Sequence, residues 1–153
     1  MSPTRLQIRE ALCATAQQAD AALLCKTYMA AKIASLPAVC VGDEEIDYQG
    51  AMGQGMTTTI WRLWLLLNAG SEWEEAQRVA DEYLDFTGDK SLVRAFTPRS
   101  GHTPAWQTLG LKDVRLLNYA RMPADIQGPN LIDWMGSVYW GVPIRVQVRY
   151  GTG

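Results

Sequence analysis

The stretch Thr57–Leu67 constrains the fold more than any other part of the sequence. It is rich in Thr, Ile, Trp and Leu, residue types that favour strands, and both of its alternating faces are apolar except at Arg62. A strand that is apolar on both sides must be covered on both sides. A layer of helices can cover one face, and another subunit is a candidate for covering the other.

The final strand has the clearest alternation in the chain. From Val142 to Tyr150, every second residue is apolar and the residues between them are mostly polar. Pro143 has no N–H to donate to a ladder, so we expect this strand to start there, at an edge or a bulge. Shorter extended pieces are predicted at Cys25–Met29, Ala38–Val41 and Asp113–Tyr119.

Three segments carry helical patterns. Ser2 and Pro3 suit the start of a helix whose apolar side continues to about Leu24. Ser71 and Glu74 have the spacing of a capping box before a second helix, which Gly88 closes, and a short helix is expected over Asp89–Phe96. The fold class predicted is α+β, a mostly antiparallel or mixed sheet with helices packed on one face, in a single domain over residues 1–153.

Composition narrows the function. The formal net charge is −2, which argues against a strongly basic nucleic-acid-binding module. The amino end lacks the apolar stretch of a signal peptide, and the longest apolar run, Leu63–Leu67, is too short to cross a bilayer. We therefore expect neither a membrane protein nor a secreted one.

No motif in the sequence points to catalysis. The three cysteines have no CxxC spacing, and we expect buried free thiols rather than a disulfide or zinc framework. The only histidine, His102, lies in a Gly/Pro-flanked segment and is expected to be a solvated loop residue. Neither a P-loop nor a Rossmann glycine pattern is present, and the acids from Asp43 to Asp47 do not match an EF-hand. We expect no catalytic, cofactor or metal site.

Residue usage and charge instead favour assembly. The chain has six Trp, six Tyr, six Met and ten Arg against four Lys, and the first four types are enriched in buried protein interfaces. Residues 41–90 hold eleven acidic and three basic side chains, a net of −8, so the remainder carries +6. Segregated charge of this kind suits head-to-tail self-association, although an acidic helix surface with scattered arginines would give the same count.

Four blocks of sequence resemble the tail terminator proteins of long-tailed, siphovirus-type bacteriophages. They span roughly residues 38–150 in the order usual for that family, and they are structural rather than catalytic. The blocks are Ile46–Tyr48 with Gly50–Gly55, Asp81–Leu84 with Gly88–Ala95, Thr108–Gly110, and Tyr139–Val142. The segment from Arg121 to Trp134 is longer than a usual hairpin connection, and the Trp content is high for the family.

The resemblance implies a non-enzymatic virion protein of the tail and neck region, made in the host bacterial cytoplasm. Such proteins form a hexameric ring on the head-proximal end of the tail tube. The ring stops addition of tube protein and offers a surface to the head-completion protein of the neck. Genomic DNA passes through the central hole without specific binding, and no cofactor or membrane is involved.

The residues expected at subunit or tail-tube contacts come from the acidic run, the Gly-rich segment after it and the arginines of the two long strands. They are Asp43, Glu44, Glu45, Asp47, Tyr48, Met52, Gly53, Gly55, Met56, Arg62, Arg145 and Arg149. Two other hypotheses stay open: another neck component, such as a head-completion or connector protein, and a small-ligand-binding domain or enzyme that uses the Trp-rich sheet as a pocket.

Overall fold

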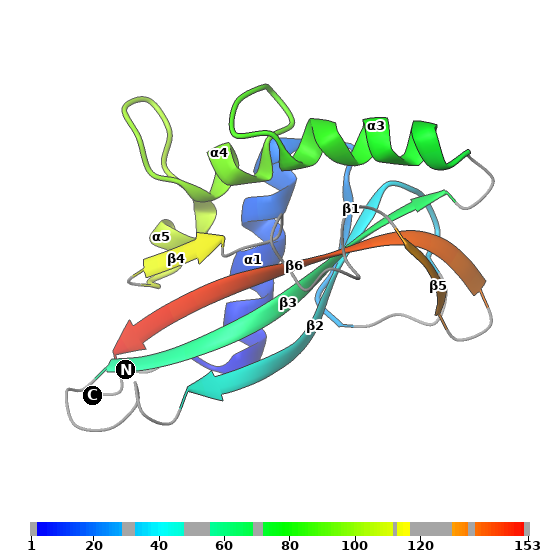
Figure 1. The fold of residues 1–153 in the computed structure, drawn as a ribbon. Coiled ribbons are helices and arrows are strands. Elements are labelled where there is room, and N and C mark those ends of the chain that lie inside the picture. The colour runs from blue at the N-terminus through cyan, green and yellow to red at the C-terminus, as the bar shows by residue number, and fades with distance from the viewer. Residues whose placement is uncertain are drawn as a thin grey trace.

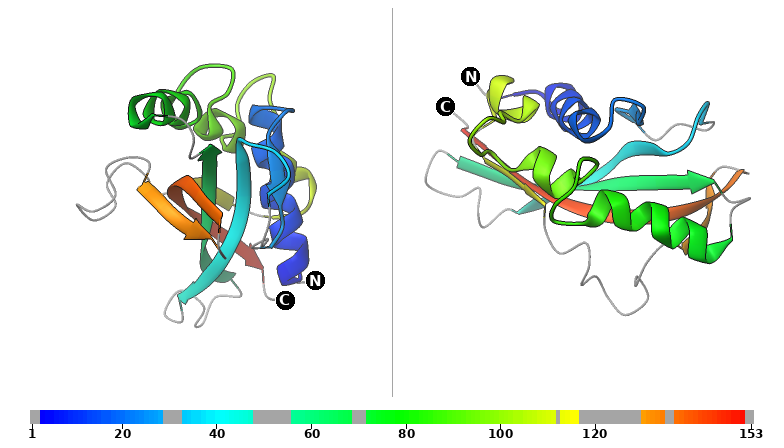
Figure 2. Two further views of the ribbon diagram at one scale, coloured as in Figure 1. Left: turned by 90° about the vertical axis from the view of Figure 1, so that its right-hand side faces the viewer. Right: turned by 90° about the horizontal axis from the view of Figure 1, so that it is seen from above.

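The structure is a computed structural model. It describes residues 3–28, 33–47, 56–68, 72–111, 113–116, 130–134 and 137–151. Its six described strands form one mixed sheet in the order β1-β2-β3-β6-β4, with β5 also paired to β6. The helices lie around this curved sheet, with α1 along one of its sides and α3 across one end (Figures 1 and 2). The predicted α+β class is confirmed.

The elements have the following bounds. The helices are α1 (Arg5–Ala19), α3 (Trp73–Leu84), α4 (Leu92–Phe96) and α5 (Ala105–Thr108). The strands are β1 (Leu24–Lys26), β2 (Ala38–Asp47), β3 (Met56–Asn68), β4 (Asp113–Leu116), β5 (Asn130–Trp134) and β6 (Ser137–Gly151).

The two long strands predicted from sequence form the centre of the sheet. β3 and β6 pair antiparallel over their whole common length, from Met56 opposite Gly151 to Asn68 opposite Tyr139. The predicted strand Thr57–Leu67 is confirmed and extends by one residue at each end. Sequence did not predict β5, which pairs antiparallel with the first part of β6.

The expectation that the final strand starts at Pro143 is wrong, because β6 begins at Ser137. Pro143 lies opposite Trp64, inside the ladder with β3. On the other side of β6, the described pairing with β5 ends at Gly141 and that with β4 begins at Val146. Pro143 therefore lies in the interval between β5 and β4, where the missing N–H removes no hydrogen bond of the described pairing with either of these strands.

β2 is longer than its sequence suggested. It continues past Val41 to Asp47, with an irregular register between Val41 and Glu44 where the pairing with β3 shifts. The acidic run is thus part of a strand, held by backbone pairing with Thr58–Trp61. β1 pairs parallel to β2 and ends at Lys26, before the expected end at Met29, a residue outside the described ranges.

The helix boundaries follow from local capping. Thr4, not Ser2, caps α1: its hydroxyl accepts from the Gln7 N–H, and the Gln7 side chain accepts from the Thr4 N–H. α3 begins after Glu72 without a side-chain cap, and the predicted cap Ser71 lies outside the described residues. The helix ends at Leu84, so the expected end at Gly88 is wrong. Ser91 caps α4 by accepting from the Arg94 N–H, which starts that helix later than expected.

Cys13 and Cys25 form a disulfide, so the expectation of free thiols is wrong for these two residues. Cys13 lies on α1 and Cys25 on β1, and their Cα atoms are 5.6 Å apart. The chain turns back after α1, and this turn brings the two thiols together although their sequence spacing matches no motif. Cys40 is a buried free thiol, as expected.

Arg9 joins α1 to the sheet. Its guanidinium donates to the carbonyl oxygens of Thr27 (2.8 Å) and Val41 (2.9 Å). It also lies over the rings of Tyr28 and Trp61, at 4.5 and 5.0 Å from their centroids. These contacts satisfy a half-buried cation within the fold, so Arg9 adds little to the charge available at the surface.

Candidate subunit interface

The two faces of β3 have different surroundings. Side chains alternate along a strand, and directly paired residues on neighbouring strands share a face. Trp61, Leu63 and Leu65 are fully buried in the main core. That core also takes in the inward residues of all four described helices, so this is the helix-covered face, as the sequence predicted.

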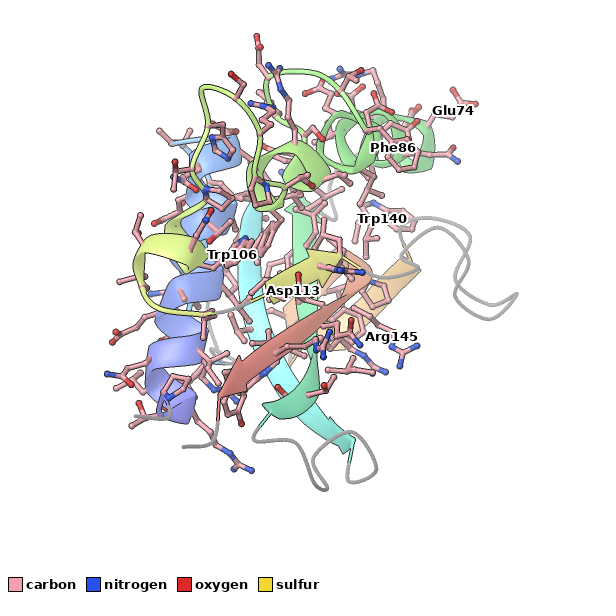
Figure 3. The ribbon with its side chains drawn as sticks, turned by 90° about the vertical axis from the view of Figure 1, so that its left-hand side faces the viewer. Glu74, Phe86, Trp106, Asp113, Trp140 and Arg145 are labelled. Atoms are coloured by element: carbon pink, nitrogen blue, oxygen red, sulfur yellow. A yellow bond between two sulfur atoms is a disulfide. The ribbon has the colours of Figure 1, made fainter. Side chains whose placement is uncertain are left out.

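The opposite face of the sheet carries four arginines. Arg62 on β3 lies directly across from Arg145 on β6. Arg145, Gln147 and Arg149 are alternate residues of β6 and therefore share this face. Arg115 of β4 pairs directly with Gln147, which places it on the same face. Arg62, Arg115 and Arg149 are exposed and Arg145 is half-buried. Figure 3 shows Arg145 on the side of the sheet away from α1. We call these four residues the arginine face.

The arginine face brings both like and unlike charges close together. Like charges directly opposite each other on paired strands destabilise a sheet, and Arg62 and Arg145 are such a pair. Arg62 lies over the Trp64 ring, 5.8 Å from its centroid. The acid of this face with a described side chain is Asp113, whose carboxylate is 3.1 Å from Arg115 Nε. Asp113 also lies opposite Arg149 in the ladder, and the ladder of β2 with β3 places Glu45 opposite Ile60 and Asp47 opposite Thr58. Acidic and basic residues are therefore neighbours in this part of the sheet.

A second, smaller core covers only one end of the same face. Leu66 and Tyr139 are buried there against Ile33, Ala38 and Cys40. Beside them, Trp64 and Ile60 remain half-buried. Ala38 and Cys40 are neighbours of Leu66 and Trp64 in the sheet itself, so the cover at that end comes from the segment around Ile33 of the same chain and not from another subunit. The arginine face lies beyond it.

α3 carries the opposite charge. Ala76, Ala80 and Tyr83 bury one side of this helix in the main core. Glu74, Asp81 and Asp85 are exposed at i, i+7 and i+11 on the outer side, and we call them the acidic stripe. No ion pair of these three is found in the part of the chain that the structure describes. Figure 3 shows Glu74 on α3, at the top of the view, with α1 on the opposite side at the left.

Neighbouring acids on α3 are paired instead. Arg78 donates to Glu75 (3.0 Å) and Glu82 (2.7 Å), and Lys90 Nζ is 3.5 Å from Glu82. The hydrogen bond from Arg78 lowers the pKa of Glu75 below its usual value, and the same pairing raises the pKa of Arg78. The two basic residues of this region are therefore engaged beside the acidic stripe and do not neutralise it.

A hydrogen bond fixes α3 to the end of α1. The Tyr83 hydroxyl donates to Asp20 Oδ2 at 2.7 Å. This bond lowers the pKa of Asp20, while burial and then the bond to Asp20 raise the pKa of Tyr83. Because Tyr83 is buried on the inner side of α3, the bond sets the helix with its acidic stripe outward.

The residues predicted at contacts fall into three groups. Arg62, Arg145 and Arg149 are brought together on one face. Asp43, Glu44, Glu45 and Asp47 form the outer half of β2, and Met56 is the first residue of β3. Tyr48, Met52, Gly53 and Gly55 lie outside the described residues.

Sequence reasoning missed Arg115 and the acidic stripe. Strand register places Arg115 beside the other arginines, and no local pattern reveals that register. The acids of the stripe were included in the charge count of residues 41–90, but only those of the run from Asp43 to Asp47 were named at contacts.

His102 is not a solvated loop residue, which corrects the sequence expectation. It is half-buried, and its Nε2 lies 2.8 Å from the carbonyl oxygen of Ala95. It borders a pocket of about 210 Å³ together with Arg94, Arg99 and Ser91. Among the described residues, no three His, Cys, Asp or Glu side chains gather as a metal site.

Comparison with known proteins adds no relative: a scan of protein-family models finds no match, and neither does a search of curated proteins. Within the described residues, no helix is both long and apolar enough to span a membrane.

Proposed function

We propose that this chain is a tail terminator, a structural virion protein that forms a hexameric ring at the head-proximal end of a phage tail tube. In this proposal the ring stops tube polymerisation and provides the attachment surface for the head-completion protein of the neck. DNA passes through its lumen without specific binding, and the protein catalyses no reaction. The four sequence blocks supply the identity proposed.

The observation that carries the proposal is that two unlike surfaces lie on different sides of the chain. The arginine face lies on one side of the sheet, whereas the acidic stripe lies on the outer side of a helix packed in the main core. A ring needs two different surfaces on each copy, because a head-to-tail contact joins one surface to the other and can close.

The disulfide agrees with a place in the virion. Disulfides persist in oxidising surroundings, including virion surfaces, and are rare in reducing cytosol. A chain made in the bacterial cytoplasm and released in a particle would reach such surroundings at lysis. Cys13 and Cys25 are already positioned to form the bond in the folded chain.

Tube growth in vitro tests the proposal. Purified chain is added to the polymerising tail tube protein of the same phage, and tube lengths and end structures are measured by electron microscopy. We expect shorter tubes with a ring at one end. An unchanged length distribution with bare ends would contradict the proposal, and binding to isolated portal-proximal neck rings alone would favour the head-completion or connector function.

A further inference from the structure

We infer that the polar pocket between the end of α1, α4 and the turn from Arg99 to His102 is a binding site for inorganic phosphate. The pocket has a volume of about 210 Å³. One water needs roughly 10–15 Å³, so the pocket has room for an ion of several atoms. The proposed function neither requires nor supplies such a ligand. The groups that face it are Arg94, Arg99, His102 and Asp89.

The turn that carries Arg99 and His102 is held in place. The two residues exchange backbone hydrogen bonds, from the Arg99 N–H at 3.3 Å and from the His102 N–H at 3.0 Å. Gly101 has a φ of +81°, which lets the chain reverse over so few residues. The His102 Nε2 lies 2.8 Å from the carbonyl oxygen of Ala95, a buried residue of α4. These contacts fix the turn relative to α4 before any ligand binds.

The other polar side chains of the wall are used within the chain. Gln18 donates to one backbone group of the segment 103–105 at 3.3 Å and accepts from another at 2.8 Å. The Ser91 hydroxyl donates to the Asp85 carbonyl oxygen and accepts from the Arg94 N–H at 3.1 Å. Gln18 and Ser91 therefore hold the walls together and leave ligand binding to other groups.

The remaining groups offer both donors and acceptors. Arg94, Arg99 and Asp89 are exposed, and within the described ranges none of their side chains has an ion pair. A carbonyl oxygen can only accept, so His102 donates from Nε2 and its neutral ring can accept at Nδ1. The pocket therefore presents two guanidinium groups together with two acceptors, the Asp89 carboxylate and Nδ1.

This combination fits an oxyanion that keeps an O–H group. Guanidinium groups bind oxyanions through paired, charge-assisted hydrogen bonds. A carboxylate repels an anion with no proton but accepts a hydrogen bond from one that has an O–H. Inorganic phosphate keeps an O–H near neutral pH, whereas sulfate and the phosphodiesters of DNA have none. Phosphate monoesters lose theirs with a pKa of about 6. Free phosphate is therefore the ligand that satisfies both kinds of group.

Titration calorimetry with sodium phosphate tests the site, on the full chain near pH 7 at constant ionic strength. Wild type should show saturable binding of one phosphate per chain. Arg94→Gln and Arg99→Gln should each weaken this binding about 10- to 100-fold, since each removes hydrogen bonds to a charged ligand. Arg115→Gln makes the same charge change at an exposed position of β4 outside the pocket and should keep the wild-type affinity.

The choice of anion tests the role of Asp89. Wild type should bind sulfate, or a phosphate monoester, at least about 10-fold more weakly than inorganic phosphate, because Asp89 then faces an anion with no proton to donate. Asp89→Asn removes the negative charge and should raise the affinity for sulfate. Equal binding of sulfate and phosphate by wild type would contradict the proposed ligand.

Three further results would overturn the site. The first is folded wild type that shows no saturable phosphate binding. The second is equal affinity in Arg99→Gln and Arg115→Gln, which would mean an adventitious ion only. The third is binding of duplex DNA, but not of phosphate, that depends on Arg94 and Arg99, which would make this a nucleic-acid surface. Thermal unfolding without phosphate verifies that each variant folds, and none of these results bears on ring formation.

Discussion

The two faces of β3 differ in how deeply their side chains are buried. On the helix-covered face, Trp61, Leu63 and Leu65 are all fully buried by the chain's own helices. On the other face, Leu66 is equally buried, but Arg62 is exposed and Trp64 is only half-buried. At these positions one side of the strand is fully buried, while the other side keeps an exposed arginine and a half-buried tryptophan. Mutations on the two faces should therefore have different effects.

The largest effect on folding is expected from the helix-covered face. Leu63→Ala should lower the free energy of unfolding by about 3 kcal/mol, because it removes a fully buried side chain and leaves a cavity. The matched variant Ile60→Ala, on the opposite face of the same strand, should cost about 1 kcal/mol, because Ile60 is only half-buried. Denaturant unfolding measures both, and equal losses would remove the distinction between the faces.

The disulfide should have a similar effect on the same side of the sheet. Replacing Cys13 and Cys25 together by Ser should cost about 3 kcal/mol, because the bond closes a short loop in the unfolded chain and joins α1 to β1. For a chain of this size, the thermal midpoint should fall by roughly 6–12 °C. A wild-type midpoint that does not move when reductant is added would count against a contribution from the bond.

A smaller effect is expected where α3 is fixed. The pKa of Asp20 is lower in the folded chain than in the unfolded chain. The hydrogen bond from Tyr83 therefore stabilises the fold fully at pH values above the pKa of unfolded Asp20, and this stabilisation is lost as pH falls through the pKa of folded Asp20. Tyr83→Phe should therefore cost about 1 kcal/mol near neutral pH, and the difference from wild type should shrink below about pH 4. Unfolding measured across this range checks both, and a difference independent of pH would show that lost packing causes the change.

The smallest effect on folding is expected on the arginine face. Arg149→Glu should change the stability of the isolated chain by less than about 0.5 kcal/mol, because the side chain is exposed. If the chain forms the proposed ring, the same variant should nevertheless reduce the fraction of chain that is assembled. Unfolding at high dilution and particle mass at high concentration check the two parts, and parallel loss of both would mean that Arg149 acts through folding.

The sequence predicted features that local chemistry determines. The two-sided strand, the alternation from Val142 to Tyr150 and the buried side of α1 all follow from the spacing of apolar residues. The start of β6 does not follow from that spacing, because pairing with β3 and β5 holds the residues before Pro143 in the sheet. The disulfide and the position of Arg115 depend on contacts between distant segments, which no spacing encodes.

The candidate interface was predictable only in part. Charge counting indicated two oppositely charged regions, and Arg62, Arg145 and Arg149 were named from the polar positions of two strands. Their common face follows from the antiparallel register of β3 and β6. The acids named at contacts came from the run that begins at Asp43, whereas the exposed acids on α3 became evident from which side of that helix is buried.

Imaging of assembled tails by electron cryo-microscopy tests the central claim most directly. The account predicts a closed ring of this chain at the head-proximal end of the tube. A tail that lacks the chain, or that carries it anywhere other than at this end, would contradict it.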